Sequence, residues 1–138
     1  MQIRPYQETD EAFVIRLWQE CELTRPWNNA KYDISRKLTT QPELFLVGVE
    51  EQVVIATAMV GFDGHRGWVN YLCVSPLHRK LSYGKAMMVE AERLLIARGC
   101  PKLNLQIRSS NAAVISFYKH LGYQLDEAVS MGKRLIPD

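Results

Sequence analysis

The sequence of 138 residues lacks several features that would mark a specialised class of protein. It has only three cysteines, Cys21, Cys73 and Cys100, and no C-x-x-C pair. This odd, scattered set argues against a disulfide framework and against a zinc site, and it fits a reducing cytosol. No apolar run approaches the roughly 20 residues that cross a bilayer, and no signal-peptide pattern is present. We therefore expect a cytoplasmic protein without a metal and without a membrane partner.

An excess of one charge sign is missing as well. The chain has 17 Lys and Arg against 15 Asp and Glu, a formal net charge of +2. This is not the electrostatic footprint of a nucleic-acid binder, and stacking aromatics do not accompany the basic residues, so we expect no nucleic-acid partner. The length and the 47% hydrophobic content are those of one ordinary domain, residues 1–138, acting as a monomer or homodimer.

The hydrophobic pattern predicts a mixture of helices and strands. Helices are expected from Thr9 or Asp10 to Cys21, around Ile34 and Leu38, over Tyr83–Arg98 and from Ser110 or Asn111 to His120. Strands are expected at Leu44–Glu50 and Val53–Phe62 as a hairpin, at Trp68–Val74, at Leu103–Ile107, and in a short segment after Gly122. The fold class is therefore α/β or α+β with a mixed sheet.

The start of the third long helix carries charge of an unexpected sign. A helix N-terminus favours acidic residues, but Arg79, Lys80 and Lys85 crowd this one, and the first acid is Glu90. Cations, free backbone N–H groups and the close approach that Gly84 permits predict an anion site, most naturally for phosphates. A Walker loop and a dinucleotide fingerprint are excluded because their required residues are missing. A solvated basic loop is the alternative.

Two sequence blocks here resemble a known family. Val74-Ser75-Pro76 followed by Arg79-x-x-Ser82-x-Gly84-x-Ala86 resembles the acetyl-CoA motif of the GNAT superfamily of N-acetyltransferases, Arg/Gln-x-x-Gly-x-Gly/Ala. Residues 111–123 resemble its second signature, Asn-x-x-Ala-x-x-Phe-Tyr-x-x-x-Gly-Phe/Tyr. Segments 25–28, 63–67, 97–102 and 132–136 resemble a bacterial branch of the family. The resemblance implies a GNAT-like, mostly antiparallel central sheet flanked by about four helices.

The same resemblance implies a set of cofactor and catalytic residues. Backbone groups of residues 72–74 would align the arm of acetyl-CoA and stabilise an oxyanion, and Tyr118 would be the general acid, since a pKa of about 10 keeps a phenol protonated. Packing alone is the alternative for Tyr118, and helix capping is the alternative for Asn111. The side chain of Cys73 is interpreted as a small core residue rather than a nucleophile. The expected cofactor-binding residues are Leu72, Cys73, Val74, Arg79, Lys80, Leu81, Ser82, Tyr83, Gly84, Lys85 and Asn111.

Two features depart from the family pattern. Ser82 replaces the first motif glycine, which would weaken cofactor binding if that position requires a positive φ. The strand 68–74 carries no carboxylate, so Asp63, His65 and Glu22 are the candidate general bases. Candidate substrate contacts are Trp27, Asn28, Tyr32, Asp63 and His65.

The sequence therefore predicts an acetyl-CoA-dependent transfer of an acetyl group to a primary amine of a small molecule or peptide. Two alternatives stay open: a protein N-terminal or lysine acetyltransferase, and a catalytically degenerate CoA-binding module.

Overall fold

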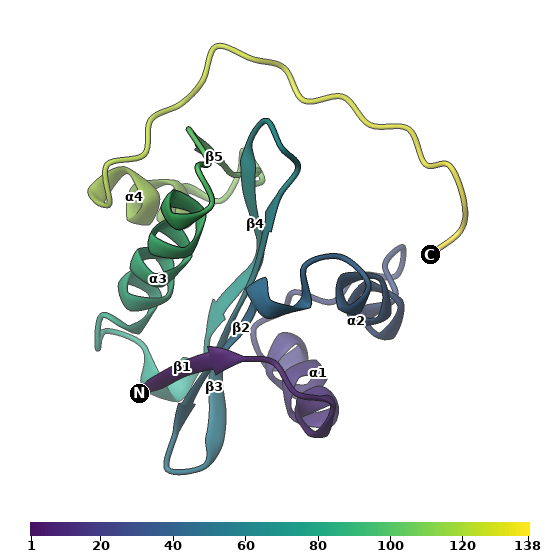
Figure 1. Cartoon of the computed structure of the whole chain (residues 1–138), viewed down its shortest axis with the longest axis vertical. Helices are drawn as coiled ribbons and strands as arrows, with labels where there is room; N and C mark the ends of the chain where they lie inside the picture. Colours follow the sequence, from purple (N-terminus) through teal and green to yellow (C-terminus); the bar gives the residue numbers. More distant parts are fainter.

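The computed structural model describes all residues, 1–138, and contains one five-stranded sheet with four α-helices (Figure 1). The strands are arranged β1-β2-β3-β4-β5, with β1–β4 antiparallel and β5 parallel to β4. This confirms the mostly antiparallel mixed sheet and its flanking helices. The strands are β1 (Gln2–Pro5), β2 (Phe45–Glu50), β3 (Val53–Phe62), β4 (Gly67–Val74) and β5 (Leu103–Asn104).

Helices cover both faces of this sheet. Figure 1 shows α1 (Glu11–Glu20) and α2 (Ala30–Leu38) on one side, and α3 (Tyr83–Ala97) and α4 (Ala112–His120) on the other. One apolar cluster lies beneath α1 and α2 around Trp18 and Phe45, and a second lies beneath α3 and α4 around Met87 and Met88. Because β3 is buried on both faces, its sequence is almost continuously apolar rather than alternating.

The hairpin between β2 and β3 forms at the predicted place. Its two turn residues, Glu51 and Gln52, both have positive φ, 49° and 66°. This is the pattern of a type I′ turn, whose twist matches that of the flanking strands, although neither residue is the usual Asn or Gly.

Three elements differ from expectation. Strand β1 was not predicted, because four residues are too few to show a period. The strand expected over Leu103–Ile107 is regular only at β5, since the chain then separates from β4 and has no partner. The short final strand is wrong: residues 124–138 contain no helix or strand and cross to the side of α2 (Figure 1). No helix combines the length and apolarity needed to span a membrane.

Candidate active site

The separation of β5 from β4 opens a cleft inside the sheet. The two strands pair only at Gly67–Leu103 and Trp68–Asn104. Beyond these pairs lies a cleft of about 710 Å³, bounded by the middle of β4, by residues 105–111, and by side chains of α2 and α4. The edge of β4 beyond Trp68 therefore has no neighbouring strand and faces an open cleft, next to the motif of residues 74–86 that follows β4.

A β-bulge changes which β4 side chains reach this cleft. The β3–β4 register shifts between Thr57 and Met59, and Tyr71 has a left-handed φ of 53°. In a regular strand, neighbouring side chains point to opposite faces, so a regular β4 would place Tyr71 away from Asn70 and Leu72. The bulge breaks the alternation, so Asn70, Tyr71 and Leu72 all line the cleft.

Buried side chains hold the bulge in place. The Trp18 indole Nε1 donates to Thr57 Oγ1 at 2.9 Å, and the Thr57 hydroxyl donates to the carbonyl oxygen of Tyr71 at 2.7 Å. The Trp18 ring stacks on the Tyr71 ring with centroids 3.8 Å apart. The left-handed backbone at Tyr71 is thus fixed both through its carbonyl group and through its ring.

The same tyrosine brings an acidic residue into the cleft. The Tyr71 hydroxyl donates to Asp33 Oδ2 at 2.5 Å. Burial and this hydrogen bond raise the pKa of Tyr71 well above its ordinary value, so it remains protonated and cannot act as a base at neutral pH. Asp33 therefore supplies the cleft carboxylate that β4 lacks. Sequence reasoning missed it, because nothing in the first turn of α2 links it to a strand residue 38 positions later.

The end of β4 presents a backbone donor to the cleft side. Ser75 N donates to Ile55 O of β3 at 2.7 Å. Since successive N–H groups of a strand point to opposite edges, the N–H of Val74 points away from β3. The carbonyl of Val74 faces the same edge, where it accepts hydrogen bonds from Cys21 Sγ at 3.4 Å and Arg79 Nε at 3.3 Å.

The side chains around Val74 are packed. Leu72 and Val74 lie against the cluster beneath α3 and α4. Cys73 is buried on the opposite face, with its thiol 3.3 Å from Thr57 Oγ1. Interaction with Cys21 and burial raise the pKa of the Cys73 thiol far above its usual value, so this residue is a protonated core cysteine.

The basic loop before α3 has unpaired donors. The backbone N–H groups of residues 80–85 donate no hydrogen bond, and Lys80 and Lys85 are exposed and form no ion pair. Ser82 has a φ of 62°, the left-handed conformation that the usual glycine adopts more easily. The loop therefore reaches the conformation expected of the motif in spite of the serine. Free N–H groups and cations together fit phosphate groups.

Glu50, at the end of β2, ties this loop down and was not found from the sequence. The Tyr83 hydroxyl donates to Glu50 Oε1 at 2.6 Å, and His78 Nε2 lies 3.6 Å from Glu50 Oε2. Gly84 serves packing between helices: a Cβ there would lie 3.1 Å from Cζ of Phe117 on α4. Glycine thus permits the close approach of α3 to α4, without any unusual φ.

Tyr118 lies where α4 borders the cleft. Its side chain is 7% exposed, and this burial raises the pKa of Tyr118 to about 12. Its hydroxyl makes no hydrogen bond within the protein, so the proton is free for a ligand in the cleft. Asn111 also lines the cleft and caps α4, with Oδ1 accepting from Val114 N at 3.3 Å. Capping and a position in the cleft thus occur together at Asn111.

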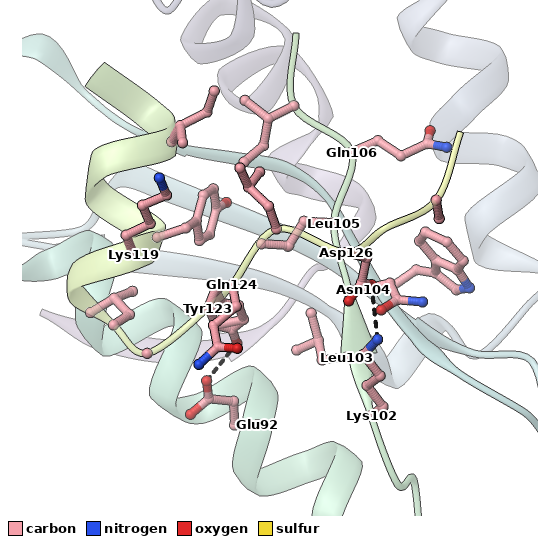
Figure 2. A pocket seen from close by; sticks show the side chains of 18 of the residues that line it. Glu92, Lys102, Leu103, Asn104, Leu105, Gln106, Lys119, Tyr123, Gln124 and Asp126 are labelled. Atoms are coloured by element: carbon pink, nitrogen blue, oxygen red, sulfur yellow. Dashed lines mark hydrogen bonds and ion pairs between the residues drawn. The ribbon is translucent and has the colours of Figure 1, made fainter. Parts of the chain in front are cut away.

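A second cavity of about 1050 Å³ is lined by side chains of α3 and α4, by residues 100–107 and by residues 121–130 (Figure 2). Two polar contacts at its wall join Tyr123 to Glu92 at 2.5 Å and Lys102 to Asp126 at 2.8 Å (Figure 2). Although it is the larger cavity, no residue from 70 to 85 lines it. The smaller cleft is therefore the candidate active site, and Tyr118 borders both spaces.

The candidate bases lie elsewhere. Asp63 is at the tip of the β3–β4 hairpin, where Oδ1 accepts from the N–H groups of His65 and Arg66, at 2.7 Å each. These backbone hydrogen bonds lower the pKa of Asp63, so this carboxylate shapes the turn. Asp63, His65 and the exposed Glu22 do not line the cleft.

Of the candidate acceptor contacts, some lie at the cleft and others do not. Asn28 lines the cleft, whereas Tyr32 is exposed and does not. The exposed Trp27 ring lies under the Arg108 guanidinium, 5.6 Å from the ring centroid. Since Arg108 belongs to the cleft wall beyond β5, this cation–π contact joins the α1–α2 loop to the opposite wall.

Comparison with known proteins finds a relative along the whole chain and solved structures with the same fold. An acetyltransferase protein of Yersinia enterocolitica is 46% identical over 138 residues, covering 100% of this chain and 98% of the relative. The aminoglycoside acetyltransferase AAC(6')-Iy, solved with a bisubstrate analogue of CoA, superposes with a TM-score of 0.80 at 15% identity over 98% of both chains. The ribosomal-protein-S18-alanine N-acetyltransferase of Escherichia coli gives 0.72 at 21% identity, over 88% of this chain and 76% of that one. The model of the acetyltransferase (GNAT) family matches residues 10–123. The chain therefore belongs to the GNAT family and is an acetyltransferase.

Proposed function

We propose that this enzyme transfers an acetyl group from acetyl-CoA to a primary amine bound in the cleft between β4 and residues 105–111. The supporting observation is that three kinds of donor lie close together. The hydroxyl of Tyr118 borders this cleft, and the N–H of Val74 and the loop before α3 lie at the end of β4, the strand that forms one wall of the cleft.

The loop residues fit a diphosphate. Arg79, Lys80 and Lys85 supply positive charge, and the backbone N–H groups of residues 80–85 have no partner within the protein. Charge-assisted hydrogen bonds from such donors to phosphate oxygens are stronger than neutral ones. The Glu50 contacts to His78 and Tyr83 keep the loop in the shape that exposes these donors.

Each protein group has a separate task in the transfer. Bound acetyl-CoA supplies an acetyl group on a thioester, open to attack by a neutral amine. The N–H of Val74 donates to the carbonyl oxygen as negative charge develops there. Tyr118 holds a proton for the departing sulfur, and burial keeps that proton in place at neutral pH. The amine nitrogen forms the new C–N bond as the C–S bond breaks, and Asp33, the one carboxylate that lines the cleft, takes up the proton that this nitrogen loses.

The acceptor is inferred from the residues that line the cleft. The fold is shared with enzymes named for an aminoglycoside and for a protein N-terminal alanine. We favour a small-molecule or peptide amine because the acceptor would lie in a cleft of about 710 Å³ lined by side chains of α2, β4 and residues 105–111, rather than on a broad surface.

Two measurements test the proposal. Acetyl-CoA should raise the melting temperature by mass action, about 2.7 kcal/mol of stabilisation at a concentration 100 times Kd; no shift at millimolar ligand would reject the cofactor. Tyr118→Phe should lower kcat by about 100-fold, the contribution of a general acid, with the affinity for acetyl-CoA unchanged. Tyr123→Phe is the matched control, because that hydroxyl bonds Glu92 instead of facing the cleft. An unaltered kcat in Tyr118→Phe excludes the phenol as the acid.

A further inference from the structure

The side chains on the acceptor side of the cleft carry more positive than negative charge. Arg25, Arg36, Lys37 and Arg108 all line it, whereas Asp33 is its one acidic residue. A chain with a formal net charge of only +2 thus gathers four cations and one carboxylate around a single cleft.

Most of these cations lack a carboxylate partner. Arg25 donates to the backbone carbonyls of Glu22 and Thr24, at 2.6 and 3.0 Å. Arg108 lies against the Trp27 ring and forms no ion pair.

Lys37 is also without a carboxylate. It is buried, donates to the carbonyl oxygen of Val60, and has its pKa lowered by burial. Only Arg36 faces carboxylates, with Nη2 3.7 Å from Asp33 Oδ1 and 3.2 Å from Asp138 Oδ1.

The contact with Asp138 shows that Arg36 binds a carboxylate. The Asp138 carboxylate accepts from Arg36 and, at 2.6 Å, from Arg134 Nη1. With its amide nitrogen turned toward it, Asn28 donates to the same carboxylate at 2.9 Å. The Asp138 side chain is only 18% exposed, although neighbouring Leu135 is 84% exposed. A carboxylate is therefore held against Arg36 and Asn28, two residues that line the cleft. The C-terminus of the chain lies beside α2 (Figure 1).

We propose that the acceptor is a primary amine that also carries an anionic group, a carboxylate or a phosphate. The amino group lies at Asp33, where the Tyr71 hydroxyl orients the carboxylate, and the anionic group takes the place of the Asp138 carboxylate at Arg36, with Arg108 on the opposite wall. This inference rests on the proposed acetyl transfer. It disfavours polycationic amines, which would bring additional positive charge toward Arg25, Arg36 and Arg108.

Matched amines test the inference. The probes are ethanolamine phosphate against ethanolamine, γ-aminobutyrate against its amide, and spermidine as a polycation, with release of the CoA thiol as the readout. At least one anionic amine should exceed its neutral partner in kcat/KM by about 10- to 100-fold, the contribution of a hydrogen bond to a charged group. The phosphate and carboxylate pairs separate the two anions.

Two variants test whether Arg36 causes the preference for anionic amines. Arg36→Gln should reduce the preference for the anionic member several-fold, through KM rather than kcat. Lys31→Gln, on the exposed surface of α2 and outside the cleft, should leave the preference unchanged. Calorimetric titration of the anionic amines into the CoA-bound protein gives the same comparison without turnover, and Arg36→Gln should weaken that binding.

Three results would overturn the inference. These are equal acetylation of charged and neutral partners, preference for spermidine, and the absence of both acetylation and binding for every anionic amine. Failure of the proposed function would look different, because acetyl-CoA would then leave the melting temperature unchanged.

Discussion

Thr57 offers a demanding test of how the cleft is built. Its hydroxyl lies in the buried layer between α1 and the sheet, where it accepts from Trp18 Nε1 and donates to the carbonyl of Tyr71. Thr57→Val keeps the shape of the side chain but removes its hydrogen bonds to Trp18 and Tyr71, along with the weaker contact to the Cys73 thiol. Two buried polar groups then lose their partner, at about 1–3 kcal/mol each. We expect a loss of about 2–6 kcal/mol in the free energy of unfolding.

Thr57→Ser is the matched control, because it retains the hydroxyl and loses one methyl group, worth about 1 kcal/mol. Urea denaturation followed by circular dichroism gives both values. In addition, Thr57→Val should weaken acetyl transfer, since the carbonyl of Tyr71 is no longer held and the bulge that brings Tyr71 and Asp33 together relaxes. A Thr57→Val protein as stable as Thr57→Ser would refute this reasoning.

Two further substitutions probe other parts of the fold. Arg4 and the Gln7 N–H donate to Asp10 and, against the opposing effect of burial, hold the pKa of Asp10 below its ordinary 3.8. The stabilisation is therefore complete above pH 3.8 and disappears as the pH falls through the lower folded-state value. Asp10→Asn should lose about 1–3 kcal/mol in urea denaturation at pH 7, and its difference from the wild type should shrink in acid; a gap constant with pH contradicts the ion pair. Ser82→Gly should leave the melting temperature unchanged or slightly higher, because relief of about 1–2 kcal/mol of left-handed strain offsets the extra entropy of glycine, about 0.5–1 kcal/mol. A drop of more than 5 °C, roughly 1 kcal/mol or more for a chain of this size, would show that the left-handed serine is unstrained.

Local sequence patterns predicted the elements that depend on local physics. The helix expected over Tyr83–Arg98 forms and ends only one residue earlier, at Ala97. It was predictable because its apolar spacing and the glycine that follows it, Gly99, are both local features of the sequence. The hairpin of β2 and β3 was found because two β-rich runs flank a two-residue turn. The basic loop was found because its charge contradicts the helix dipole.

The parts that were missed depend on contacts between distant segments. No local signal marks the bulge at Tyr71, since it results from Trp18 and Thr57 packing beneath it. Asp33 looked like an ordinary first-turn acid on α2 until the fold placed it against Tyr71. Glu50 likewise gains its role only when the end of β2 meets the loop before α3.

The donor at the edge of β4 belongs to the main chain, and this limits how mutation can alter it. Every residue type except proline retains the N–H of position 74, so ordinary substitutions there change packing against α3 and α4 without deleting the donor. In the proposed reaction, the hydrogen bond from this N–H to the acetyl carbonyl oxygen can therefore persist while the sequence of this strand changes. Side chains at the acceptor end, such as Asp33 and Arg36, have no such protection, and each can be lost in a single step. Within this fold, the acetyl donor is expected to be kept and the acceptor to change.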